Sequence, residues 1–251
     1  MDNKERFSNR VEMYAKYRPS YPEAAMSYLY DTVGLSDDCT VADIGAGTGI
    51  FSKLLIARGI RVIAVEPNEP MRRAAESDLA GERNFRAVAG AAESTGLPDQ
   101  SVDFIVCAQS FHWFNHAEAR IEFHRILKPG GKAVLIWNSR LLKGTPFLEQ
   151  YEQLLRTFGT DYAKTNHKNI SREALTAFFH NGDMQEARFM NRYAHDFEQL
   201  SGRMQSSSYI PVSGDPAYEP MMVELRNVYE RTNQDGVVFF DYETEVYWGE
   251  V

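Results

Sequence analysis

Several features are scarce in this sequence, and each shortage excludes a class of protein. The 251 residues include two cysteines, Cys39 and Cys107, without CxxC spacing, so a disulfide-rich scaffold is excluded and buried reduced thiols are expected. Apolar runs such as Ala133–Trp137 are far shorter than the roughly 20 residues of a membrane-spanning helix. The charged start, Met1–Arg6, lacks the apolar stretch of a signal peptide. We therefore expect a soluble, cytoplasmic protein with no membrane partner.

An excess of basic residues is also absent. The chain has 27 Lys and Arg against 35 Asp and Glu, a formal net charge of −8. An acidic chain has no general attraction to phosphate backbones, so we expect no nucleic-acid partner. The hydrophobic fraction of 43% is enough for a core and argues against disorder. The length fits one large α/β domain, and no linker separates residues 139–251 from the rest.

Short apolar segments alternate with amphipathic ones through the first half of the chain. This alternation predicts a parallel sheet covered by helices on both faces. The expected strands are Thr40–Ile44, Arg61–Val65, Phe85–Ala89, Val102–Ala108 and Lys132–Trp137. The expected helices between them contain Phe51, Leu54 and Leu55, then Pro70–Leu79, then a segment capped by Asn115 and reaching Leu127.

The pattern changes after Asn138. We expect helices at Pro146–Phe158, Arg172–Phe179 and Pro216–Arg231, and strands at Gln185–Phe197 and Val237–Trp248. The two late strands should pair at the edge of the sheet. Near the N-terminus, two prolines predict an extended link over Tyr14–Pro22. The predicted fold is thus a doubly wound, mostly parallel α/β sheet with helical additions.

A glycine-rich loop lies between the first strand and the first helix. It begins at Asp43 and has glycines at Gly45, Gly47 and Gly49. Glycines there let backbone N–H groups approach a ligand closely. The dinucleotide fingerprint GxGxxG would need glycine where this chain has Ile50, so the spacing favours a ligand without a pyrophosphate. The other interpretation of the loop is a simple tight turn.

The second strand ends at an acidic residue, Glu66. A carboxylate at this place can accept hydrogen bonds from both hydroxyls of a ribose, although a lone Glu here can also be merely solvated. The loop and the carboxylate in this order predict an adenosine-containing ligand.

Four segments in order resemble the successive motifs of class I S-adenosylmethionine-dependent methyltransferases. They are VADIGAGTG (41–49), AVEPN (64–68), the segment 90–98 and RILKPGGKAVLIW (125–137). More narrowly, the stretches at 17–22, 109–114 and 206–209 resemble a small-molecule branch that includes trans-aconitate methyltransferase-like proteins. The resemblance implies a Rossmann-like fold with a seven-stranded sheet and S-adenosylmethionine as the cofactor.

The resemblance also implies which residues hold the cofactor. The glycines would pass beneath its methionine part, Glu66 would hold the ribose, and an Asp of many relatives is replaced by Ala91. The implied cofactor-binding residues are Tyr14, Arg18, Asp43, Gly45, Gly47, Gly49, Glu66, Pro67, Met71, Ala92, Glu93, Gln109 and Ser110.

The acceptor side is expected outside the shared core, which spans about residues 35–140 of a single domain. Residues 1–30 would form a lid, and residues 139–251 would carry acceptor-side elements, with Arg140, Arg203 and Tyr209 as possible contacts. His112 is the candidate general base, because imidazole titrates near neutrality, although a packed structural histidine is the alternative. Phe111, Trp113 and Phe114 would wall the acceptor pocket or belong to the core.

The predicted function is transfer of a methyl group to a small-molecule acceptor by in-line displacement. No group of histidines and acids has metal-ligand spacing, so no metal is expected. Two alternatives stay open: an NAD-dependent oxidoreductase, and a cofactor-binding protein of this fold without turnover. Protein methylation is a further possibility, whereas the segment AQSFHWF (108–114) lacks an NPPY-like signature for amino groups.

Overall fold

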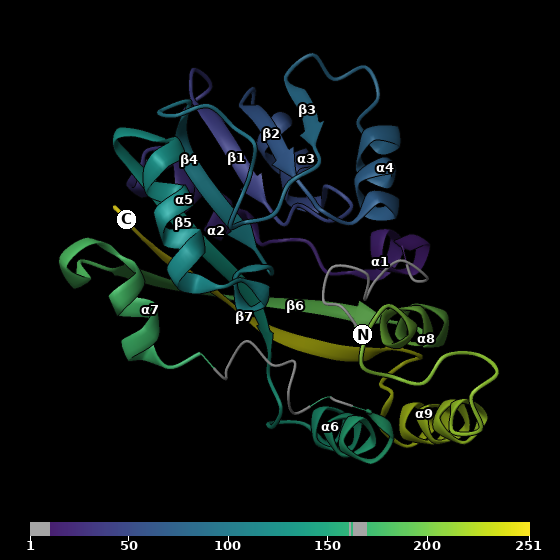
Figure 1. Ribbon diagram of the computed structural model, residues 1–251. Coiled ribbons are helices and arrows are strands. Elements are labelled where there is room, and N and C mark those ends of the chain that lie inside the picture. The colour runs from purple at the N-terminus through teal and green to yellow at the C-terminus, as the bar shows by residue number, and fades with distance from the viewer. Residues whose placement is uncertain (1–10, 161, 163–169) are drawn as a thin grey trace.

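A computed structural model describes residues 11–160, 162 and 170–251 (Figure 1). Its centre is a seven-stranded sheet in the order β3-β2-β1-β4-β5-β7-β6. The strands are β1 (Thr40–Ile44), β2 (Arg61–Val65), β3 (Phe85–Val88), β4 (Val102–Ala108), β5 (Leu127–Arg140), β6 (Gln185–His195) and β7 (Val238–Gly249). Strands β1 to β5 are parallel, while β7 runs antiparallel to both β5 and β6. The predicted mostly parallel sheet with two late strands at its edge is confirmed.

Helices cover both faces of this sheet (Figure 1). They are α1 (Val11–Tyr17), α2 (Glu23–Tyr28), α3 (Ile50–Ile56), α4 (Glu69–Asp78), α5 (His116–Ile126), α6 (Pro146–Phe158), α7 (Arg172–Phe178), α8 (Phe197–Gln205) and α9 (Tyr218–Thr232). A π-helical turn, η1 (Leu29–Val33), extends α2, and the short 3₁₀ turns η2 (Phe111–Trp113) and η4 (His180–Gly182) complete the described helices. None of the described helices has both the length and the apolar content needed to cross a bilayer.

Side chains alternate along each strand, so the apolar core forms a separate cluster on each face of the sheet. Ala42 and Ile44 of β1 face α5 and α7, whereas Val41 faces α2, η1 and α3. Successive residues of a strand point to opposite faces, so the buried strands are apolar throughout. A third apolar cluster joins α6, α8 and α9 to β7, and Figure 1 shows these helices together beside the late strands.

The prediction of an extended link over Tyr14–Pro22 is wrong for its first residues. Helix α1 continues to Tyr17, and only the residues from Arg18 to Pro22 are non-helical. The reason is that a proline restricts mainly the residue before it, so Pro19 permits a helix up to Tyr17. Figure 1 shows α1 between α4 and α8, both of which it contacts.

Two further differences concern the edges of elements. Strand β5 starts at Leu127, before the predicted Lys132, and its register against β4 shifts between Val102 and Phe104. Residues 129–131 therefore form an irregularity inside the strand, which is how a Pro-Gly-Gly sequence fits into a ladder. Helix α8 was not predicted, although Asp196 and Gln199 form the capping box that begins it.

Candidate functional site

A cavity of about 290 Å³ lies at the carboxyl ends of the parallel strands. Segments that follow β1, β2, β3 and β4 all contribute to it, and α1 and α8, which lie far apart in the sequence, add residues as well. The strand order reverses between β1 and β4, and ligands of open α/β sheets bind at such a switch point. The lining consists of Tyr14, Arg18, Pro19, Tyr21, Gly45, Ala46, Gly47, Ile50, Phe51, Glu66, Pro67, Asn68, Met71, Ala91, Ala92, Glu93, Ala108, Gln109, Ser110, Trp113, Phe114, Asn138 and Arg203.

The glycine-rich loop forms one wall, and two of its glycines face the cavity. Gly45 has φ +69°, and a Cβ added to it would lie 2.5 Å from the Cβ of Ser110. Gly47 has φ +58°, with only the Met71 sulfur within 4 Å of an added Cβ. The Gly45 N–H donates to the Val65 carbonyl oxygen at 2.8 Å, which ties the loop to β2. The positive φ therefore favours glycine at both positions, and at Gly45 there is also no space for a side chain.

Gly49 and Asp43 support the loop and do not line the cavity. A Cβ on Gly49 would lie 3.1 Å from the Cβ of Ala75, so this glycine lets α3 approach α4. Asp43 is fully buried, and its Oδ2 accepts a hydrogen bond from the Ser52 hydroxyl at 2.7 Å. Its Oδ1 has no hydrogen-bond partner among the described residues. Burial raises the pKa of Asp43 to about 7.

Glu66 stands at the end of β2 with its carboxylate fixed by two backbone groups. The Gly47 N–H donates to Oε2 and the Asn68 N–H donates to Oε1, each at 2.8 Å. The residue is 7% exposed and lines the cavity. Burial raises the pKa of Glu66, while the two amide bonds oppose this rise. A carboxylate oxygen has two lone pairs, so each oxygen keeps one acceptor site for a ligand.

Apolar residues from the segments after β2 and β3 line the same cavity as Glu66. Pro67 precedes α4 and Met71 lies in its first turn, where Asn68 caps the helix by accepting from the Met71 N–H at 3.0 Å. Ala92 is buried on the opposite segment after β3. Its neighbour Glu93 lines the cavity as well, but its Oε1 accepts from the Asn115 N–H at 2.7 Å, at the start of α5. One oxygen of Glu93 therefore already holds a helix end in place.

Gln109 and Ser110 follow β4 and close the floor of the cavity. Gln109 has φ +61°, and its N–H donates to the Ile136 carbonyl oxygen at 2.9 Å. Ser110 is buried, and its hydroxyl donates to the Ile44 carbonyl oxygen at 2.6 Å. The Ser110 proton is thus engaged by β1, which leaves the hydroxyl oxygen as an acceptor.

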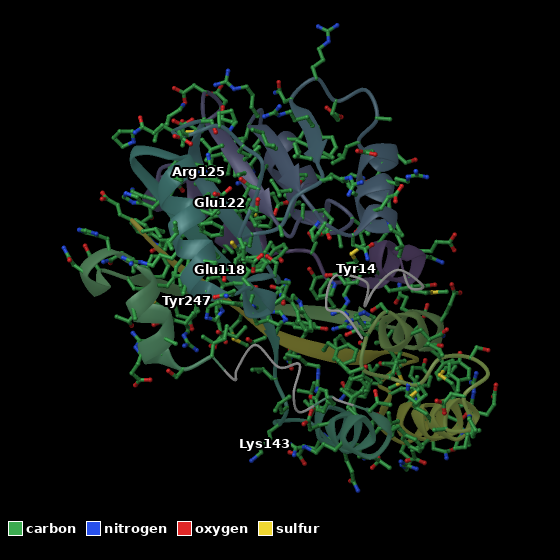
Figure 2. All side chains as sticks on the ribbon, viewed as in Figure 1. Tyr14, Glu118, Glu122, Arg125, Lys143 and Tyr247 are labelled. Atoms are coloured by element: carbon green, nitrogen blue, oxygen red, sulfur yellow. The ribbon has the colours of Figure 1, made fainter. Side chains whose placement is uncertain are left out.

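Tyr14 and Arg18 cover the cavity from the N-terminal side. Figure 2 places Tyr14 at α1, and the Arg18 guanidinium lies 4.7 Å from the centre of the Tyr14 ring. Arg18 Nη2 also donates to the Ser206 carbonyl oxygen at 3.0 Å. The N-terminal segment is therefore bound to the end of α8 across the cavity.

The aromatic segment after β4 divides between the core and the cavity. Phe111 is fully buried and stacks on the His116 ring at 4.2 Å, whereas Trp113 and Phe114 line the cavity. His112 is not among the lining residues, and its Nδ1 accepts from the Trp137 indole N–H at 3.3 Å. The general-base role of His112 stays a prediction.

Only one of the three possible acceptor contacts lines the cavity. Arg203 lines the cavity. Arg140 instead forms a buried ion pair with Glu152 at 2.6 Å, and Tyr209 packs its ring 5.0 Å from that of Tyr162. Arg140 and Tyr209 are not lining residues.

Sequence reasoning missed Asn138, which lines the cavity from β5. Its Nδ2 donates to the Ser20 carbonyl oxygen at 2.9 Å, and its Oδ1 accepts from the Thr244 hydroxyl at 2.6 Å. A signal was present, because a polar residue near the carboxyl end of a parallel strand lies at the ligand-binding edge of such sheets.

Comparison with known proteins gives a consistent family. The model of a protein family described as a methyltransferase domain matches residues 42–135. An uncharacterized methyltransferase of Schizosaccharomyces pombe is 29% identical over 250 residues, which cover 97% of this chain and 96% of the relative. An uncharacterized methyltransferase of Mycobacterium tuberculosis is 38% identical over 134 residues, covering 53% of this chain and 52% of the relative. The chain thus aligns with nearly all of the first relative and with about half of the second.

A similar fold is found among solved structures. The structure of a proposed type II methyltransferase from Anaeromyxobacter dehalogenans superposes with a TM-score of 0.67 at 21% identity, covering 93% of this chain and 98% of that one. At this identity the likeness concerns the fold alone. The glycine loop and Glu66 lie inside the segment that the family model matches.

Proposed function

We propose that this chain is a class I S-adenosylmethionine-dependent methyltransferase, which binds the cofactor in the cavity at the carboxyl ends of β1 and β2 and transfers its methyl group to a small-molecule acceptor. The observation that carries the proposal is the carboxylate of Glu66, held by the Gly47 and Asn68 amides at the wall of that cavity. A carboxylate oriented in this way matches the two adjacent hydroxyls of a ribose.

The residues around Glu66 fit an adenosyl group. Pro67, Met71 and Ala92 offer apolar surface for a planar base next to the ribose position. The loop leaves room for the rest of the cofactor at Gly47, where only the Met71 sulfur lies within 4 Å of an added Cβ, whereas Ser110 fills the space beside Gly45. Gln109 and Ser110 lie on the same floor.

The methionyl end of the cofactor would contact the N-terminal segment. Arg18 lines the cavity and carries a guanidinium that suits the methionyl carboxylate, with Tyr14 stacked beside it. When bound, the cofactor supplies a methyl group that its sulfonium has already activated. The chain then has to hold the acceptor in line and exclude water. Tyr14, Arg18 and Arg203 border the cavity from outside the shared core. Their positions support the proposed lid at 1–30 and acceptor-side elements at 139–251, of which residues 1–10, 161 and 163–169 lie outside the described part of the chain.

Two roles in this proposal rest on the sequence. His112 is the candidate base for an oxygen or nitrogen acceptor, and an acceptor that is already an anion needs none. Trp113 and Phe114, which line the cavity, suit the wall of an acceptor pocket. A cytoplasmic location is likewise a prediction from the sequence.

Thermal denaturation with S-adenosylhomocysteine or NAD separates the proposal from the oxidoreductase alternative. A ligand that binds only the folded state raises the melting temperature, and at a given concentration a tighter ligand raises it more. We expect stabilisation by S-adenosylhomocysteine and none by NAD, because Ile50 occupies the position of the third glycine of the dinucleotide loop. Stabilisation by NAD alone would overturn the cofactor assignment.

A screen with methyl-labelled S-adenosylmethionine then addresses the acceptor. Carboxylic acids, phenols, amines and a whole-protein extract are the arms of the screen. Label in a small molecule supports the proposal, and label only in protein would refute the small-molecule assignment. Cofactor binding without transfer to any arm would favour the alternative without turnover.

A further inference from the structure

Two arginines from distant parts of the chain enter the same cavity. Arg18 follows α1, and Arg203 lies on α8. Both guanidiniums reach Ser206, because Arg18 Nη2 donates to its carbonyl oxygen at 3.0 Å and Arg203 Nη1 lies 3.5 Å from its hydroxyl oxygen. Burial lowers the pKa of Arg18, and the charge of Arg203 lowers it further. Two cations are thus held close together at one end of the cavity.

Neither cation has an anionic partner among the described residues. Arg203 is 8% exposed, and its hydrogen-bond partners are neutral hydroxyls, such as that of Tyr242 at 3.3 Å and that of Ser207 at 3.2 Å. Arg18 Nε is buried without any hydrogen-bond partner in the described chain. Buried charges are normally paired, as Arg140 is paired with Glu152 in this same protein.

The cofactor cannot neutralise this end of the cavity. S-adenosylmethionine has one carboxylate, together with a positive ammonium and a positive sulfonium. If its carboxylate binds Arg18, Arg203 stays unpaired, and the sulfonium adds another positive charge nearby. Positive charge gathered at this end of the cavity, in a low-dielectric setting, favours an anionic second ligand there.

We propose that the methyl acceptor carries an anionic group, a carboxylate or a phosphate, which Arg203 binds at the acceptor end of the cavity. This inference rests on the proposed function and adds the substrate class and the residue that selects it. The guanidinium presents several donors in a fixed plane, which matches the oxygens of either anion. The hydroxyls of Tyr242 and Ser207 accept hydrogen bonds from Arg203 and hold it in place.

Thermal denaturation of the S-adenosylhomocysteine complex tests the inference without turnover. Acetate, succinate and inorganic phosphate are titrated at constant ionic strength into protein saturated with S-adenosylhomocysteine. At least one anion should add stabilisation, and the more effective one distinguishes a carboxylate site from a phosphate site. Loss of a charged hydrogen-bond partner should weaken the apparent anion affinity of Arg203→Met by at least about tenfold.

Arg226→Met is the matched control, because Arg226 is exposed on α9, stacks on Phe197 and does not line the cavity. It should respond to the anions as the wild type does. Arg203→Lys keeps the cation and should retain part of the response, which separates loss of charge from loss of folding. The proposal is overturned if no anion adds stabilisation, or if Arg203→Met responds like the wild type. Failure of S-adenosylhomocysteine itself to stabilise the wild type would overturn the proposed function first, and this inference with it.

Discussion

Replacement of Glu66 by glutamine tests the ribose site with almost no change in side-chain volume. In the structure the Glu66 oxygens accept from the Gly47 and Asn68 N–H groups, each at 2.8 Å. Glutamine has only one side-chain oxygen, and its amide nitrogen would face one of these two donors. The variant therefore loses one charge-assisted hydrogen bond to the ribose and gains an opposed pair of donors beside the loop.

The expected loss follows from the energy of a hydrogen bond to a charged group. Such a bond contributes about 1.5–3 kcal/mol, which corresponds to about a 10- to 150-fold weaker affinity. Isothermal titration of Glu66→Gln with S-adenosylhomocysteine measures this change directly. Glu69→Gln is the matched control, because Glu69 is exposed on the first turn of α4 and pairs with Arg73 there. The control should bind with wild-type affinity.

A double-mutant cycle distinguishes direct contact from disturbance of the loop. Removal of the ribose hydroxyls from S-adenosylhomocysteine should weaken binding to the wild type, but add little further loss in Glu66→Gln. Equal affinity of the variant and the wild type for the intact ligand would refute the assignment. So would fully additive losses, since they would mean that the carboxylate and the hydroxyls do not interact.

Three further predictions concern the surroundings of the cavity. Gly45→Ala should abolish measurable binding of S-adenosylhomocysteine in the titration, because its Cβ would lie 2.5 Å from that of Ser110 and its φ is +69°. Asp43→Asn should raise the unfolding free energy by about 4 kcal/mol above pH 7 and by less near pH 5. The reason is that burial raises the pKa of Asp43 from 3.8 to about 7, so its ionisation destabilises the folded state increasingly as pH rises. Urea unfolding at both pH values measures this difference. Gly202→Ala should release α1 from α8, because its Cβ would overlap the Tyr17 ring, and faster amide hydrogen exchange in α1 would report the release.

Controls make these predictions specific. Gly34 has a φ of +100° and open space around an added Cβ. Gly34→Ala should therefore lower the unfolding free energy by only the roughly 1–2 kcal/mol of a left-handed residue and leave ligand binding unchanged. Asp31→Asn removes an exposed carboxylate and should change the unfolding free energy by no more than about 0.5 kcal/mol. Unchanged binding in Gly45→Ala, a pH profile of Asp43→Asn equal to that of the wild type, or unaltered exchange in α1 of Gly202→Ala would each contradict the corresponding argument.

The sheet and its ligand-binding edge could be predicted from local patterns. Apolar runs such as Thr40–Ile44 and Arg61–Val65 are typical of strands buried on both faces, and the structure confirms them as β1 and β2. The cap at Asn115 was also predictable, since its side chain accepts from the Glu118 N–H. These features depend on residues that are near in sequence.

Features that depend on tertiary contacts were not accessible in this way. The proximity of Arg18 and Arg203 arises because α1 packs on α8, where Gly202 leaves room for Tyr17. No local pattern reports a contact across so many residues. The same holds for Arg140, whose partner Glu152 on α6 removes it from the cavity lining. Patterns thus predicted which residues have useful chemistry, and packing decided which of them share the site.

A crystal structure of the complex with S-adenosylhomocysteine tests the central claim most directly. The account predicts that both ribose hydroxyls lie within about 3 Å of the Glu66 carboxylate oxygens, with the carboxylate of the homocysteine part toward Arg18. A structure in which the ligand binds elsewhere, or in which its ribose contacts no part of Glu66, would contradict the account.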